Sequence, residues 1–133
     1  MSEPQKPTVP VTGITPYVQV RSAREAADLY QKAFGAEVVD IREMGGKVIH
    51  CHIRINGGSM FLNDPFPEHG HPLEKPQRFT LHLQVDDADK WWARALAAGL
   101  EVTMPIGLQF WGDRYGQLRD SLGLLWSIGS TPS

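Results

Sequence analysis

Apolar and polar residues follow strand-like and helix-like patterns in the first half of the chain. Residues 14–20 alternate as in a strand, and residues 23–34 place apolar side chains at helical spacing. Gly35 follows, and glycine commonly ends a helix. Alternation and glycine-rich turns predict three further strands at residues 37–42, 47–55 and 59–63. We therefore expect a strand–helix–strand–strand–strand unit here.

The second half of the chain repeats the pattern of the first half. LQVDDADKWWARALAAGLEV (Leu83–Val102) restates VQVRSAREAADLYQKAFGAEV (Val18–Val38) with one residue fewer in the helix. Two copies of so long a repeat do not suggest a solenoid. They predict an α+β fold, in which two tandem βαβββ units form a curled mixed sheet with the helices on its outer face. We place a flexible tail at residues 1–12 and a single domain at 13–129, made of repeats 13–64 and 78–129.

Strand alternation also assigns side chains to the two faces of each predicted sheet. One face carries the apolar side chains that should cover the helices, and Cys51 falls on it as a small core residue. The opposite face carries Thr15, Tyr17, Gln19, His50, His52, Arg54, Thr80, His82 and Gln84. We expect this second face to line a pocket.

Composition narrows the classes of function. At 133 residues, 41% of them apolar, the chain suits one domain with an ordinary core. The formal net charge is −2 and no basic face is visible, which argues against nucleic-acid binding. No apolar run approaches the ~18 residues that span a bilayer, so we expect no membrane partner. A lone cysteine, Cys51, predicts no internal disulfide and favours a cytoplasmic location.

Two segments carry a family resemblance. GKVIHCHIRINGGSMFLND and FWGDRYGQLRDSLGLLWSI resemble the vicinal oxygen chelate superfamily, and its PhnB-like branch in particular. This superfamily includes glyoxalases, bleomycin-resistance proteins, extradiol dioxygenases and fosfomycin-resistance enzymes, and the resemblance covers about residues 13–129. It implies sheets that curl into a cup. By the repeat, FWGDRYGQLRD is a turn entering a strand, with Gly112 and Gly116 supplying backbone freedom and Asp113 and Arg114 pairing with each other or capping backbone groups.

The resemblance also implies where a metal would bind. The superfamily's four ligand positions fall here on Thr15, Leu62, Thr80 and Ser127. Neutral hydroxyls and a hydrocarbon are poor ligands for zinc, nickel, manganese or iron, so we expect no cofactor. The alternative is a divalent metal at His50, His52 and His82, since His50 and His52 lie roughly 7 Å apart on one strand face.

Three functions remain open. The first is a metal-free small-molecule-binding protein that sequesters a planar or aromatic compound such as an antibiotic, with no catalytic residue, similar to the bleomycin-resistance proteins. Its expected ligand-binding residues are Tyr17, His50, His52, His82, Trp111, Arg114 and Tyr115. Arg54 or Arg114 would pair with an acidic group of the ligand. The alternatives are a metal-dependent glyoxalase-like lyase, isomerase or dioxygenase, and a non-catalytic interaction module. The resemblance implies a homodimer in all three cases.

Overall fold

The computed structural model describes residues 11, 13–66 and 79–132. The chain divides into two compact units, each of which is described by itself. Unit 1 comprises Met1–Ala27 and Ala36–Leu73, and unit 2 comprises Asp28–Gly35 and Glu74–Ser133. The predicted tail at 1–12 lies almost entirely outside the described residues, as does most of the connection between the repeats.

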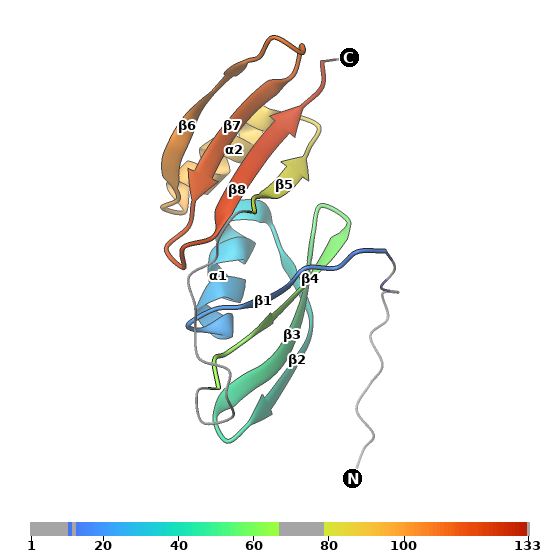
Figure 1. Cartoon of the computed structure of the whole chain (residues 1–133), viewed down its shortest axis with the longest axis vertical. Helices are drawn as coiled ribbons and strands as arrows, with labels where there is room; N and C mark the ends of the chain where they lie inside the picture. Colours follow the sequence, from blue (N-terminus) through green and yellow to red (C-terminus); the bar gives the residue numbers. More distant parts are fainter. Residues whose placement is uncertain (1–10, 12, 67–78, 133) are drawn as a thin grey trace. The chain divides into compact units, whose positions relative to one another are not determined.

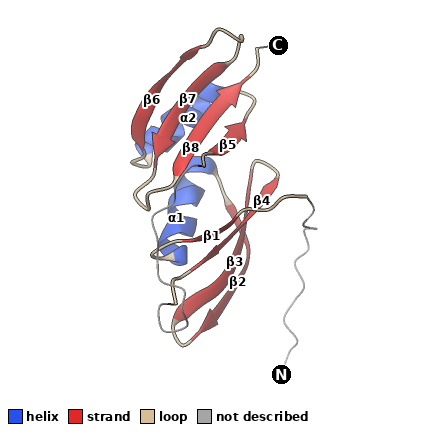
Figure 2. Cartoon of the chain, viewed as in Figure 1, coloured by secondary structure: helices blue, strands red, loops and turns tan. Residues whose placement is uncertain are grey.

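Unit 1 contains a four-stranded mixed sheet (Figures 1 and 2). Its strands are β1 (Tyr17–Gln19), β2 (Glu37–Met44), β3 (Lys47–Ile55) and β4 (Gly58–Asn63). They lie in the order β1-β4-β3-β2, with β1 parallel to β4 and the other pairs antiparallel. This matches the strands predicted from alternation in the first half of the chain.

Unit 2 repeats this sheet. Its strands are β5 (Leu81–Gln84), β6 (Glu101–Leu108), β7 (Arg114–Arg119) and β8 (Leu125–Ser130). Their order, β5-β8-β7-β6, again has one parallel pair at one edge and antiparallel pairs elsewhere. The predicted α+β fold with tandem βαβββ units is therefore confirmed.

In each unit, a side chain at or just after the end of the last strand forms a hydrogen bond with the first residue of the helix. Helix α1 covers Ala23–Phe34, as predicted, and α2 covers Ala88–Ala97. The carboxylate of Asp64, just after β4, accepts a hydrogen bond from the backbone N–H of Ala23 at 2.7 Å. The hydroxyl of Ser130, at the end of β8, accepts one from Ala88 at 3.2 Å. Equivalent positions of the two repeats thus satisfy the first free N–H of each helix.

The core of unit 2 lies between its sheet and its helical residues. Helix α2 covers one face of the sheet, and Trp92 is buried there (Figure 2). Tyr30 and Phe34 belong to the part of α1 assigned to unit 2, and their rings contact Trp126 at centroid distances of 5.1 and 4.6 Å. The buried carboxylate of Asp120 accepts hydrogen bonds from the Tyr30 hydroxyl at 2.6 Å and the Trp126 indole at 2.9 Å.

Asp120 also fixes the turn between β7 and β8. Its other oxygen accepts the backbone N–H groups of Leu122 at 2.9 Å and Leu124 at 3.0 Å. Desolvation by burial, followed by the nearby Asp120 carboxylate, raises the pKa of Tyr30, so this phenol stays protonated and continues to donate. The carboxylate is satisfied by protein groups and serves the fold.

The segment 110–120 is a turn that leads into β7, as expected, but two details differ from the prediction. Gly112 does adopt a positive φ of 97°. Gly116 does not, and it is required for space, because a Cβ there would lie 2.6 Å from the Trp92 ring. Arg114 pairs with Asp89 of α2 at 2.7 Å and not with Asp113.

The register corrects the predicted role of Leu62. Val18 lies opposite Leu62, and both are buried on the helix side of the sheet. Phe61 lies opposite Tyr17, just as Ser127 lies opposite His82 in unit 2. Phe61, not Leu62, therefore occupies the first repeat's counterpart of Ser127.

Leu62 was assigned wrongly because the turn before the last strand differs in length between the two repeats. Four residues separate Arg54 from its partner Ser59, whereas five separate Arg119 from its partner Leu125. The offset between the repeats therefore rises from 65 residues before the turn to 66 after it. Matching Gly58 with Gly123 shifted the last strand by one position, and a shift of one residue moves every side chain to the other face.

Candidate functional site

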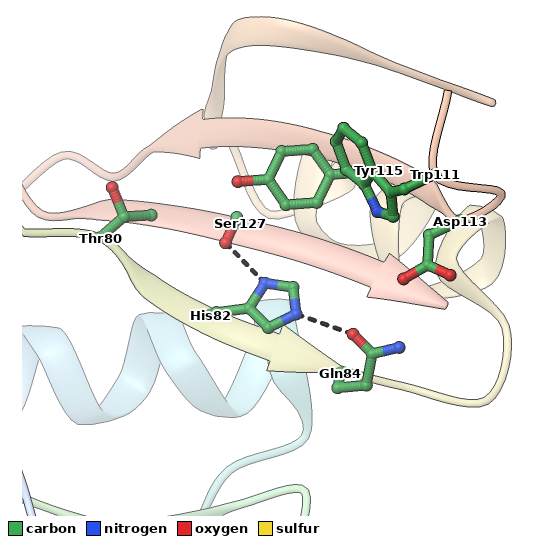
Figure 3. A pocket seen from close by; sticks show the side chains of 7 residues that line it. All are labelled: Thr80, His82, Gln84, Trp111, Asp113, Tyr115 and Ser127. Atoms are coloured by element: carbon green, nitrogen blue, oxygen red, sulfur yellow. Dashed lines mark hydrogen bonds between the residues drawn. The ribbon is translucent and has the colours of Figure 1, made fainter. Parts of the chain in front are cut away.

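A pocket of about 390 Å³ lies on the sheet face of unit 2 that points away from the core (Figure 3). The buried side chains of Leu83 and Val85 alternate with the pocket residues of β5, as predicted. The lining residues are Thr80, His82, Gln84, Trp111, Asp113, Tyr115 and Ser127. Strands β5, β7 and β8 and the loop before β7 thus all contribute.

A chain of hydrogen bonds runs along the floor of the pocket. The Gln84 amide nitrogen donates to the Thr131 hydroxyl at 3.0 Å, which orients its oxygen toward Nε2 of His82 at 2.8 Å (Figure 3). Because that oxygen can only accept, Nε2 of His82 carries a hydrogen. In the neutral ring Nδ1 is then an acceptor, and the Ser127 hydroxyl lies 2.7 Å away to donate to it. Both ring nitrogens of His82 are therefore engaged by the protein.

Aromatic rings form the other wall. Tyr115 stacks near His82, with centroids 5.8 Å apart and ring planes inclined by 26°. Trp111 meets Tyr115 edge-on at 5.6 Å and 68°. Gln117 donates to the Tyr115 hydroxyl at 3.0 Å and holds this ring from the neighbouring position on β7. Trp111 is 49% exposed, so its ring can still cover a bound molecule.

Asp113 gives the pocket its charge. Its carboxylate makes no hydrogen bond or ion pair with any residue that the structure describes. Its backbone carbonyl accepts the N–H of Gln109 at 2.9 Å, and Gly112 donates to the carbonyl of Gln109 at 3.0 Å. The tight turn therefore fixes Asp113 through its main chain and leaves its side chain available.

The corresponding face of unit 1 is packed with rings. Phe61 lies at the centre, with its centroid 5.6 Å from Tyr17, 4.7 Å from His50 and 5.1 Å from His52. His52 is buried and its Nε2 lies 2.8 Å from the Ser59 hydroxyl. Burial, more than any neighbouring charge, lowers the pKa values of His50 and His52.

The predicted site residues thus fall into two groups. His82, Trp111 and Tyr115 come together around the pocket of unit 2, whereas Tyr17, His50 and His52 surround Phe61 in unit 1. Arg114, bound to Asp89, does not line the pocket. Arg54 donates to the carbonyl of Gly57 at 2.6 Å.

Four residues that line the pocket were absent from the expected ligand-binding residues, namely Thr80, Gln84, Asp113 and Ser127. Alternation had already placed Thr80 and Gln84 on the same face as His82, which was a usable signal. Ser127 was considered only as a poor metal ligand, and Asp113 only as part of a turn.

The side chains of the pocket do not fit a divalent metal. Asp113 supplies the one carboxylate, and the other polar groups are the hydroxyls of Thr80 and Ser127, the Gln84 amide, and a histidine whose two nitrogens both have protein partners. A single carboxylate among such weak ligands does not make up the three or four strong ligands of a typical site. Within each unit, no group of three or more His, Cys, Asp or Glu side chains among the described residues lies close enough to hold an ion. Among the described residues of unit 1, His50 and His52 therefore have no third ligand, and the alternative metal site gains no support.

Comparison with known proteins places the chain in context. Residues 11–128 match the family model described as Glyoxalase/Bleomycin resistance protein/Dioxygenase superfamily. An uncharacterized protein of Mycobacterium tuberculosis strain H37Rv is 40% identical over 123 residues, which cover 87% of this chain and 72% of that protein. Neither helix in the described part of the chain is long and apolar enough to cross a membrane.

Solved structures of other proteins share the fold. Protein PA1353 from Pseudomonas aeruginosa is 24% identical with a TM-score of 0.76, covering 92% of this chain and 99% of that chain. The PhnB protein from Bacillus cereus is 23% identical with a TM-score of 0.71, covering 90% of this chain and all of that chain. At these identities the likeness concerns the fold alone.

Proposed function

Because the chain belongs to the Glyoxalase/Bleomycin resistance protein/Dioxygenase superfamily, we propose that it uses the pocket of unit 2 to bind a small planar aromatic molecule without a metal. The observation that carries this proposal is the pocket itself, in which Trp111 and Tyr115 offer ring surfaces beside polar groups of His82 and Ser127. A planar compound such as an antibiotic would be held there and sequestered unchanged.

The size and lining of the pocket support a ligand of this kind. Its volume of about 390 Å³ suits a small bicyclic ring system. Small-molecule sites of roughly 300–1,000 Å³ typically combine apolar walls with a few placed polar groups. The Tyr115 ring, held by Gln117, is a rigid surface for stacking.

The chemistry of the lining favours binding over metal-dependent catalysis. A glyoxalase-like enzyme needs a metal to polarise a carbonyl and a base to move a proton. The hydroxyls and the amide of this pocket are weak ligands, the ring nitrogens of His82 face Ser127 and Gln84, and Asp113 is the one remaining strong ligand among the lining residues. Binding of a planar ligand requires none of these groups to change partner.

The proposal is tested by calorimetric titration with quinoline, a planar bicycle that is uncharged at neutral pH. Quinoline should bind one site per chain, and Tyr115→Leu should weaken binding about fivefold, because a ring pair contributes about 0.5–1.5 kcal/mol. Tyr17→Leu is the matched control, since it removes the same side chain from the other unit. EDTA should leave the affinity unchanged. Absence of binding, or equal losses in both variants, contradicts the proposal.

A homodimer is also part of the proposal, on the family resemblance. Sedimentation equilibrium of the wild-type protein, with and without quinoline, measures it directly. A purely monomeric protein that still binds quinoline would remove the dimer from the proposal and retain the pocket.

A further inference from the structure

We propose that the pocket of unit 2 selects organic cations, and specifically a positively charged nitrogen attached to or within a planar ring. This inference rests on the proposed binding function and names the class of ligand for the same site. Three features of the described residues support it. They are the charge of the lining, the geometry of the rings, and the binding of Arg114 to Asp89.

The charge of the lining comes from Asp113. Of the seven lining residues, Asp113 is the one acid, and none is a lysine or arginine. Its carboxylate is half-buried and has no hydrogen-bond or ion-pair partner among the residues that the structure describes. A half-buried carboxylate attracts a cation more strongly than one in open water, because the effective dielectric constant around it is lower.

The ring geometry favours the same class of ligand. Trp111 and Tyr115 meet at 68° with centroids 5.6 Å apart, so they present two differently oriented aromatic surfaces beside Asp113 (Figure 3). The face of an aromatic ring carries partial negative charge and attracts a cation within about 6 Å, with tryptophan the best partner. An ammonium or a quaternary ring nitrogen would gain from both rings and from the carboxylate.

The nearest arginine in the sequence does not neutralise this site. Arg114 follows Asp113 directly, yet its guanidinium makes two hydrogen bonds to Asp89 of α2, at 3.2 and 2.7 Å. Because successive residues of a strand point to opposite faces, Arg114 lies on the helix side when its neighbour lines the pocket. The adjacent pair therefore separates its charges, and the negative charge stays on the pocket side.

The test compares three ligands that share one ring system: 1-methylquinolinium, quinoline and quinoline-6-carboxylate. In calorimetric titrations of the full chain, the cation should bind about tenfold tighter than quinoline, from the combined ring and carboxylate attraction. The anion should bind weakest. Raising the salt concentration should weaken binding of the cation and leave quinoline unaffected.

Two variants test whether Asp113 causes the preference for the cation over quinoline. Asp113→Asn keeps the shape of the side chain and should reduce the preference for the cation to about threefold, the part supplied by the rings. Asp28→Asn makes the same change of charge at an exposed position of α1 that does not line the pocket, and it should leave the tenfold preference intact. Far-ultraviolet circular dichroism confirms that each variant is folded.

The outcomes separate this inference from the proposed function. If quinoline or the anion binds as tightly as the cation, or if Asp113→Asn keeps the full preference, the cation inference is overturned. Quinoline binding that still depends on Tyr115 would leave the proposed function in place. If none of the three ligands binds, both proposals fail together.

Discussion

The two units of this chain have the same strand order but different surfaces on the sheet face away from the core. In unit 2 that face holds a pocket with Ser127 on its floor, 2% exposed. In unit 1 the equivalent position holds Phe61, whose ring contacts Tyr17 and His50. The change from serine to phenylalanine at this central strand position is thus one of the differences between the pocket and the aromatic cluster.

The difference shows that duplication preserves the scaffold more strictly than the site. Positions that start the helices keep their roles, since Asp64 and Ser130 both accept a backbone N–H. Positions on the pocket face do not, because nothing in the pairing of strands requires a particular side chain there. The strand order and the helix starts keep the repeat, and the open face is free to diverge.

The strongest test of this comparison places phenylalanine, the residue at position 61 of unit 1, at the equivalent position 127 of unit 2. Ser127→Phe should abolish quinoline binding, because a phenylalanine ring would fill the floor of the pocket and remove the partner of His82 Nδ1. Calorimetric titration measures the loss.

Ser127→Ala is the matched control, since it removes the same hydrogen bond without filling the pocket. It should weaken binding about fivefold, consistent with a net hydrogen-bond contribution near 1 kcal/mol. If Ser127→Phe still bound quinoline like wild type, the pocket would not be the binding site.

The scaffold could be predicted from the sequence because its signals are periodic. Helix α1 was placed at residues 23–34 from apolar spacing and the glycine that follows, and the structure has it at Ala23–Phe34. The match between Leu83–Val102 and Val18–Val38 then predicted the same order of elements in the second half as in the first. Leu62 was misplaced because one extra residue lies in the second repeat's last turn, and the length of a turn leaves no trace in strand alternation.

The lining of the pocket could be predicted only in part. Alternation placed His82 on the pocket face of its strand, whereas Trp111 and Tyr115 were named as aromatic residues expected to line the pocket, and all three do line it. Asp113 was expected to pair with the adjacent Arg114 or to cap backbone groups. In the structure Arg114 binds Asp89, which is 25 positions away, and the Asp113 carboxylate lines the pocket. Sequence spacing does not reveal which of two acids a guanidinium will bind.

The helix side offers a second comparison, with an effect on stability. Cys51 and Gly116 are equivalent positions on β3 and β7, and both are buried. Gly116→Ala should lower the free energy of unfolding by about 2 kcal/mol, because the new Cβ would lie 2.6 Å from the Trp92 ring and 2.8 Å from the Ile106 Cα. Cys51→Ala should cost less, about 1 kcal/mol, since it removes only a buried sulfur. Urea unfolding of both variants checks the order, and equal losses would contradict the close packing at Gly116.

The smallest expected effect concerns the histidines of unit 1. Burial lowers the pKa of His52, so the folded protein disfavours the charged ring more than the unfolded chain does. The unfolded chain then binds more protons as the pH falls below about 6.5, the ordinary pKa of histidine, and the free energy of unfolding should decline with it. His52→Gln keeps a polar group that can reach Ser59 but does not titrate, and it should flatten this part of the pH profile of urea unfolding. Ring proton resonances of His52 should titrate below 6.5 in the native protein; a midpoint above that value would show that the aromatic cluster around Phe61 does not exclude water from this ring.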